Sequence, residues 1–184
     1  MVPENIAHVE GPSLVLRLIR PEDAEYVHAL RTNPVYNRHL SEVHGAADVQ
    51  RHWIGGYKTR EAEGREFYYV IERKDGVRCG LVRLYGIGPE SFTWGSWILD
   101  ANKPPKAALE AAYLVYLVAF DLLGLSRAEF DVRRDNANTL EFHRRFGATE
   151  THSDERDFYF VYPRARYEAD RAGFLAILQR ESRA

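Results

Sequence analysis

Residues 131–148 read DVRRDNANTLEFHRRFGA, and this stretch decides the fold. It begins inside a segment from Arg127 to Val132 whose apolar residues alternate with polar ones, which predicts a strand. Asp135 or Asn136 then supplies a side-chain oxygen that can cap a helix, and Gly147 is the residue type that ends one. The stretch therefore predicts a strand that leads directly into a helix.

A strand, a loop and a longer helix precede this unit. Ser91 to Ile98 predicts the strand, 101–106 the loop and 107–123 the helix. The helix contains AAYLVYLVAF at 111–120, which has no charge but is too short for a membrane span, because that needs roughly 18 residues. We expect this helix to pack against a sheet and its neighbours, and the crossover requires the strands on either side of it to be parallel.

The rest of the chain adds strands separated by turn residues, and further helices. Together they predict an α/β protein of α+β type, with a mixed, mostly antiparallel sheet of six or seven strands flanked by helices on both faces. The additional strands are expected at 13–19, 67–72, 78–85, 152–154 and 157–161, and the additional helices at 21–32, 48–63 and 163–179.

The domain organisation follows from what the sequence lacks. No low-complexity segment, long linker or fixed-period repeat divides the chain. We therefore predict one domain over 1–184, with its core at about 13–162 and a C-terminal helix at about 163–180.

Composition excludes several classes of function. The 25 Lys and Arg against 27 Asp and Glu leave a net charge of −2, without the basic excess typical of nucleic-acid binding. Cys79 is the only cysteine, which excludes an intramolecular disulfide and suits a reducing, cytoplasmic location. The histidines show no metal-ligand spacing, and no secretion signal or membrane span is recognised, so we expect neither a metal nor a membrane partner.

Three segments resemble the GCN5-related N-acetyltransferase superfamily: LRLIRPEDA at 16–24, WGSWI at 94–98 and NANTLEFHRRFGA at 136–148. The resemblance covers about residues 13–162, and its element order matches the order derived above. It implies an enzyme that uses acetyl-coenzyme A, or another short acyl-coenzyme A, as co-substrate. It also implies direct transfer of the acyl group to a primary amine of a small molecule, without a covalent enzyme intermediate.

The expected pyrophosphate loop departs from the family pattern. KPPKAA at 103–108 stands where the family has Arg-x-x-Gly-x-Ala, so the loop glycine is missing. Lys103 and Lys106 add positive charge at a helix N-terminus, where backbone N–H groups favour anions. The resemblance assigns phosphate contacts to these lysines and to the backbone of Ala107 and Ala108.

Other cofactor contacts are also implied by the resemblance. The backbone of Trp97, Ile98 and Leu99 would pair with the pantetheine arm. Asn136 would contact the cofactor through its side-chain amide; the alternative for Asn136 is helix capping alone.

For catalysis, the resemblance points to His143. This residue aligns with the tyrosine that protonates the departing thiolate in the family, and imidazole exchanges protons near neutral pH. The alternative is a surface histidine on a helix. The family's strand glutamate, the usual base, is replaced by Thr93, so the base would be water or a residue from elsewhere.

The acceptor is expected to lie near the loop that carries His39, Glu42 and His44, with Tyr85 and Trp94 as further contacts. The ending FHRRFGA resembles enzymes that acylate nucleotide-linked amino sugars for polysaccharide biosynthesis. The alternatives are a ribosomal-protein, peptide or small-amine acetyltransferase, and a non-catalytic module that binds acyl-coenzyme A or a partner. The oligomeric state is left open, with a homodimer as one alternative.

Overall fold

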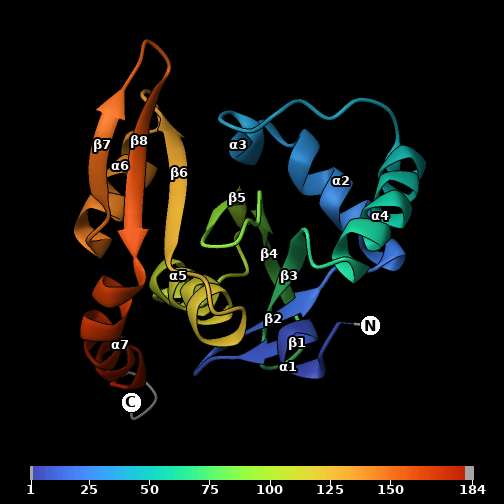
Figure 1. The fold of residues 1–184 in the computed structure, drawn as a ribbon. Coiled ribbons are helices and arrows are strands. Elements are labelled where there is room, and N and C mark those ends of the chain that lie inside the picture. The colour runs from blue at the N-terminus through green and yellow to red at the C-terminus, as the bar shows by residue number, and fades with distance from the viewer. Residues whose placement is uncertain (1, 181–184) are drawn as a thin grey trace.

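The computed structural model describes residues 2–180, which form one eight-stranded sheet in the order β1-β2-β3-β4-β5-β6-β8-β7 (Figure 1). All neighbouring strands are antiparallel except β5 and β6, which run parallel as the predicted crossover requires. The strands are β1 (His8–Glu10), β2 (Leu14–Leu18), β3 (Phe67–Arg73), β4 (Arg78–Tyr85), β5 (Ser91–Leu99), β6 (Arg127–Arg133), β7 (Thr149–Ser153) and β8 (Asp157–Pro163).

The strand count exceeds the prediction of six or seven. The missed strand is β1, whose three residues are too few to show an alternating pattern. The five predicted helices lie close to their predicted positions, although the expected helix over 107–123 changes to a π-helix, η2, after Tyr116. The helices are α1 (Glu4–Ala7), η1 (Pro21–Asp23), α2 (Ala24–Thr32), α3 (Pro34–Asn37), α4 (Ala47–Ala62), α5 (Ala107–Tyr116), η2 (Leu117–Leu122), α6 (Ala137–Phe146) and α7 (Arg164–Gln179). The two four-residue helices, α1 and α3, were not predicted.

Helices cover both faces of the sheet because the central strands are apolar on both sides. In β3, Tyr69 and Ile71 pack into the cluster that includes α5, α6 and α7, whereas Tyr68 and Val70 pack against α2 and α4. Alternate residues of a strand point to opposite faces, so a strand covered on both sides has an almost unbroken apolar run.

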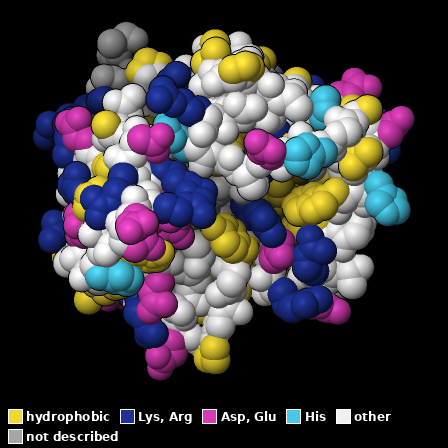
Figure 2. All heavy atoms as spheres, turned by 90° about the horizontal axis from the view of Figure 1, so that it is seen from above, with side chains coloured by type: hydrophobic (Ala, Val, Ile, Leu, Met, Phe, Trp, Pro, Cys, Tyr) yellow, Lys and Arg dark blue, Asp and Glu magenta, His cyan; other side chains and the backbone are white. Residues whose placement is uncertain are grey.

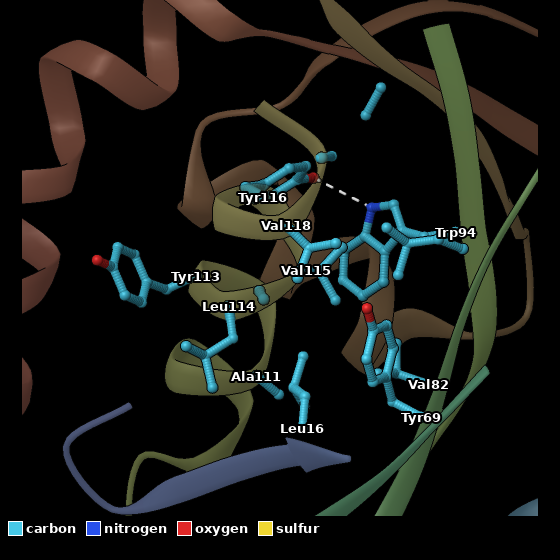
Figure 3. Packing of buried hydrophobic residues seen from close by; sticks show 14 of the residues in the cluster. Leu16, Tyr69, Val82, Trp94, Ala111, Tyr113, Leu114, Val115, Tyr116 and Val118 are labelled. Atoms are coloured by element: carbon cyan, nitrogen blue, oxygen red, sulfur yellow. Dashed lines mark hydrogen bonds between the residues drawn. The ribbon is translucent and has the colours of Figure 1, made fainter. Parts of the chain in front are cut away.

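The apolar helix α5 lies at the centre of the larger cluster (Figure 3). Ala111, Leu114 and Val115 are fully buried, and the hydroxyl of Tyr116 accepts a hydrogen bond from Trp94 Nε1 at 3.2 Å. Burying each large apolar side chain contributes about 1.5–3 kcal/mol, which explains why this helix has no polar face. Within residues 2–180, no helix is both long and apolar enough to cross a membrane.

Glu110 is the one charged residue buried in the first turns of α5. Only 1% of it is exposed, and its Oε1 accepts hydrogen bonds from the backbone N–H groups of Ser13 (2.7 Å) and Leu14 (2.8 Å). The carboxylate thereby joins the start of β2 to α5, at the helix end where negative charge is favourable.

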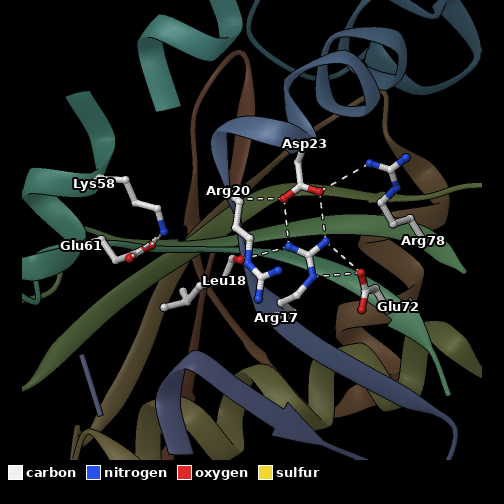
Figure 4. A network of polar contacts seen from close by, with 8 residues as sticks. All are labelled: Arg17, Leu18, Arg20, Asp23, Lys58, Glu61, Glu72 and Arg78. Atoms are coloured by element: carbon white, nitrogen blue, oxygen red, sulfur yellow. Dashed lines mark hydrogen bonds and ion pairs between the residues drawn. The ribbon is translucent and has the colours of Figure 1, made fainter. Parts of the chain in front are cut away.

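An ionic network holds η1, which leads directly into α2, to the sheet (Figure 4). Arg17 on β2 contacts both Asp23, at 2.9 Å, and Glu72 on β3, at 2.8 Å. Burial alone would raise the pKa of Asp23, but hydrogen bonds from Arg17 and the Arg20 backbone outweigh burial and lower it. The network fixes where α2 starts, and α2 leads into the loop that borders the cavities described below.

The two parallel strands separate soon after they meet. β5 pairs with β6 only at Ser91–Arg127 and Phe92–Ala128, and the two strands then diverge (Figure 1). A bulge adds to the divergence: the β4–β5 register shifts after Leu81, and Ser96 has a positive φ of 48°. The edge of β5 that faces β6 is therefore unpaired beyond Phe92, and a wedge opens there.

Candidate active site

A cavity of about 340 Å³ fills this wedge, and we call it the wedge cavity. A second space of about 630 Å³ continues from it along β5 toward the start of α5; we call it the β5 groove. His39, Trp97 and Asn136 line both, so the two spaces meet at these side chains. Seen from above, dark-blue Lys and Arg side chains lie beside a hollow near the middle of this face (Figure 2).

His143 lines the wedge cavity but is not a surface residue. Only 4% of it is exposed, and its ring packs among aromatic rings, with Phe130 at 4.4 Å and Trp94 at 5.3 Å between centroids. Burial lowers the pKa of His143 to about 3, so the ring is neutral at pH 7. Its Nδ1 has no hydrogen-bond partner among the residues that the structure describes.

His39 faces the same cavity from the opposite wall. Its Nδ1 lies 3.2 Å from Oδ1 of Asp135, in the turn that follows β6, and 23% of the His39 side chain is exposed. The pair joins the loop after α3 to the start of α6 across the mouth of the wedge. A carboxylate beside Nδ1 favours a hydrogen on that nitrogen and leaves Nε2 available to accept a proton.

Tyr85 and Trp94 both line the wedge cavity, as the sequence analysis expected of acceptor contacts. Burial is the main cause of the raised pKa of Tyr85. Gly95 leaves room for this tyrosine, because a Cβ at Gly95 would lie only 3.3 Å from its hydroxyl oxygen.

The other two predicted acceptor contacts lie elsewhere. Glu42 and His44 are strongly exposed and 3.6 Å apart, and they line a neighbouring pocket instead of the wedge cavity. The loop that carries His39 turns away from the wedge after Ser41, so only its first part reaches the cavity.

Three charged lining residues were missed by the sequence analysis: Arg83, Asp131 and Arg133. Burial, followed by the nearby charge of Asp157, raises the pKa of Asp131. Part of this lining could have been predicted, because polar residues two positions apart in an otherwise apolar strand lie on the same face of the sheet. That pattern identifies the shared face but not the cavity, which forms only where β5 and β6 part.

The β5 groove contains most of the residues predicted to bind the cofactor. Trp97, Ile98 and Leu99 line it on the unpaired edge of β5, and Lys103 and Ala108 line it at the start of α5. Ala107 is buried, so only its backbone is available there.

Lys106 stands at the position of the missing loop glycine and adopts a backbone conformation typical of glycine. It is the N-cap of α5 and has a left-handed backbone, with φ 60° and ψ 14°. Glycine adopts this conformation freely, whereas other residues pay about 1–2 kcal/mol for it. The backbone at Lys106 therefore has the left-handed conformation that a glycine would adopt there. The Lys106 side chain extends to α7, where Nζ donates to the Ile177 carbonyl at 3.2 Å.

Asn136 caps α6, as one of the two alternatives expected. Its Oδ1 accepts a hydrogen bond from the backbone of Thr139 at 3.4 Å. Because Asn136 also lines both the wedge cavity and the β5 groove, its side-chain NH₂ remains a predicted contact for a bound cofactor.

A splayed parallel strand pair, with an unpaired strand edge leading to a helix N-terminus, defines the acyl-coenzyme A-dependent class of acyltransferase that the sequence resembles. Residues 13–149 match the model of the acetyltransferase (GNAT) domain. The chain belongs to this family and is a GNAT acetyltransferase. Membership implies an acyl-coenzyme A co-substrate.

Solved structures agree with this family. The chain is 36% identical to FdhC, described as a nucleotide-linked sugar GNAT, over 93% of this chain and 98% of that one, with a TM-score of 0.86. The spermidine N-acetyltransferase of Vibrio cholerae, solved with coenzyme A and spermine, is 18% identical, with a TM-score of 0.73 and coverage of 86% and 99%. The latter likeness supports the fold alone. No curated protein sequence matches the chain.

Proposed function

We propose that this acetyltransferase acylates the primary amine of a nucleotide-linked amino sugar, using acetyl-coenzyme A or another short acyl-coenzyme A. The observation that carries this proposal is the lining of the wedge cavity, which contains two arginines, Arg83 and Arg133, and one carboxylate, Asp131. Both arginines also have carboxylate partners outside this lining, Glu66 at 2.7 Å and Asp157 at 3.7 Å. An acceptor that carries phosphates suits two arginines. The 36% identity to a nucleotide-linked sugar GNAT supports the same acceptor class.

The charge of the cavity disfavours a polyamine acceptor. A polyamine carries several positive charges and would need an acidic lining, whereas Arg83 and Arg133 would repel it. Asp131 is the one acidic residue of this lining, and it suits a single ammonium group. We assign Asp131 the role of drawing that ammonium into the wedge.

His39 is the residue best placed to take a proton from the acceptor. It lies where the wedge cavity meets the β5 groove, and Asp135 beside Nδ1 directs Nε2 to this task. Once the amine is neutral, its nitrogen attacks the acyl carbon, the C–N bond forms and the C–S bond breaks. The nitrogen then loses a second proton and the departing sulfur gains one, so the products are the amide, the free thiol and the proton held by His39. Because the amine attacks the thioester directly, no covalent enzyme intermediate forms.

His143 stands where the family has its acid tyrosine, and its burial limits what it can do. A ring whose pKa is lowered to about 3 carries no imidazolium proton at neutral pH. We therefore assign His143 the role of a neutral N–H donor that stabilises the departing sulfur by a hydrogen bond.

The remaining residues hold the co-substrate, which supplies the activated thioester. The unpaired edge of β5 from Trp97 to Leu99 offers backbone groups to the pantetheine amides. Lys103 and the first N–H groups of α5 offer donors to the pyrophosphate, whereas the Lys106 side chain is directed to α7.

Thiol release on mixing the enzyme with acetyl-coenzyme A and candidate acceptors tests the proposal. The panel contains UDP- and dTDP-linked amino sugars, the matching free amino sugars, spermidine and an N-terminal peptide. We expect kcat/KM for one nucleotide-linked sugar to exceed that for its free sugar at least about tenfold, because only the former carries phosphates for the arginines. A preference for spermidine or for the peptide would overturn the proposal.

A further inference from the structure

A separate pocket of about 280 Å³ lies beyond Arg83, and nothing so far assigns it a ligand. Ser41 and Arg83 line both this pocket and the wedge cavity, so the two spaces are adjacent. Its other walls come from α2, α4 and β3, through Arg31, Trp53 and Tyr68. We call it the arginine pocket.

Arg31 is the unusual residue of this pocket. Only 9% of it is exposed, and its Nη2 donates to the backbone oxygen (2.9 Å) and the hydroxyl (2.8 Å) of Ser41. Its Nε has no hydrogen-bond partner, and no carboxylate within residues 2–180 forms an ion pair with it. A buried guanidinium without a counter-charge is unfavourable, which points to an anion that arrives from outside.

A second unpartnered group lies in the same pocket. Tyr68 is almost completely buried, yet its hydroxyl has no hydrogen-bond partner among the described residues. Burial raises the pKa of Tyr68, and the neighbouring Arg31 guanidinium partly opposes this, so the two groups interact although neither completes a hydrogen bond of good geometry. Buried polar groups are normally fully paired, so an anion beside Arg31 and Tyr68 would supply the acceptor that both lack.

The remaining charges near the pocket also leave an excess of positive charge. Arg83 donates to Glu66 at 2.7 Å, but the same carboxylate accepts from Arg60 at 3.0 Å, so one acid serves two arginines. At the mouth, Glu42 and His44 lie 3.6 Å apart, and both are exposed to solvent.

Trp53 supplies a flat apolar wall. It is 36% exposed, and the guanidinium carbons of Arg60 and Arg83 each lie 5.5 Å from its ring centroid. An aromatic ring beside arginines suits a planar base attached to phosphates, since bases pack on aromatic and guanidinium planes.

We propose that the arginine pocket binds the nucleoside diphosphate part of the acceptor, with the phosphates between Arg31 and Arg83 and the base against Trp53. The sugar then extends past Arg83 into the wedge cavity, where its amine meets His39. This assignment rests on the proposed function, because it concerns the same acceptor.

Calorimetric titration tests the pocket without turnover. UDP, dTDP, GDP, inorganic pyrophosphate and uridine are titrated into enzyme saturated with coenzyme A, which keeps these probes out of the β5 groove. We expect one nucleoside diphosphate to bind more tightly than pyrophosphate or uridine. Arg31→Met and Arg83→Met should each weaken that binding by roughly 10- to 100-fold, the loss of a charge-assisted contact.

Arg51→Met is the matched control, because Arg51 is exposed on α4 and lines neither cavity; its affinity should equal that of the unaltered enzyme. Folding has its own readout, because Arg31 donates two hydrogen bonds to Ser41 and Arg83 pairs with Glu66, and losing these contacts can lower the Tm. The Tm of each ligand-free variant is therefore measured first, and the titrations are run at a temperature at which every variant is folded. Equal affinity in all variants would overturn the proposal. Pyrophosphate that binds as tightly as every nucleoside diphosphate would also overturn it, because the site would then take any small anion.

Turnover separates this proposal from the proposed function. A nucleotide-linked sugar that is acylated with the same KM by Arg31→Met and unaltered enzyme would refute the pocket and leave the function standing. Diphosphate binding that is lost in both arginine variants, in an enzyme that acylates only other amines, would support the pocket and refute the function.

Discussion

Two histidines face the same cavity from opposite walls, and their surroundings give them opposite properties. His39 is partly exposed and lies 3.2 Å from the carboxylate of Asp135, whereas His143 is enclosed by aromatic rings. In His143, burial lowers the pKa to about 3. The comparison teaches that burial can remove an imidazole from proton transfer at neutral pH, so alignment with a catalytic position is not sufficient.

The largest expected effect on kcat comes from replacing His39, the partly exposed histidine. His39→Gln keeps a polar side chain but removes the base, so kcat at pH 7 should fall by roughly 10²–10⁴-fold, the usual contribution of a general base. Steady-state kinetics with a fixed acceptor measures it, and KM for acetyl-coenzyme A should change little. A kcat within threefold of the unaltered enzyme would remove His39 from the mechanism.

His143, the buried histidine, should affect the pH dependence of the free energy of unfolding more than it affects kcat. Because the pKa of His143 is about 3 when folded and near 6.5 when unfolded, only the unfolded chain gains this proton between those values. The free energy of unfolding should therefore fall as pH drops from 6.5 toward 3, by about 1.4 kcal/mol per pH unit from this group.

His143→Phe should remove that part of the acid dependence, since phenylalanine has a similar shape and cannot be protonated. Denaturant melts at pH 7, 5.5 and 4.5 would compare the two slopes. At pH 7, kcat should fall by about tenfold, because a hydrogen bond that contributes about 1.5 kcal/mol corresponds to roughly a factor of ten. A loss as large as that of His39→Gln would mean that His143 does the proton transfer after all.

The smallest effect on kcat is expected from replacing Asp135, whose contact with His39 joins the two walls of the wedge. Asp135 is largely exposed, and exposed ion pairs contribute at most about 1 kcal/mol, so Asp135→Asn should lower kcat by about fivefold or less. High salt should reduce the difference between the two enzymes. A decrease comparable to that of His39→Gln would show that the carboxylate is essential to the base.

Much of the fold could be predicted because its signals are local. The apolar run at 111–120 and the capping residues around 136–147 place α5 and α6 without reference to other segments. α4 forms as predicted despite Gly55 and Gly56. Both glycines lie on its exposed side, where a side chain would meet nothing within 4 Å. β1 escaped prediction because three residues carry no periodic signal.

The candidate site could be predicted only in part. Residues on the edge of β5 and at the start of α5 follow from their positions in one strand–loop–helix unit. Arg31, Arg83 and Asp131 come from α2, β4 and β6, and no spacing along the chain relates them. The burial of His143 did have a signal, since Leu140, His143 and Phe146 recur every three residues on the inner face of α6.

The sequence by itself determined the order of elements, the parallel crossover and the family, because periodicity, caps and turn residues act over a few neighbouring positions. Only the tertiary structure decided which histidine can accept a proton and where an anion can bind. Both depend on desolvation and on charges brought together from distant segments, and these exist only once β5 and β6 have separated and the helices have packed around the wedge.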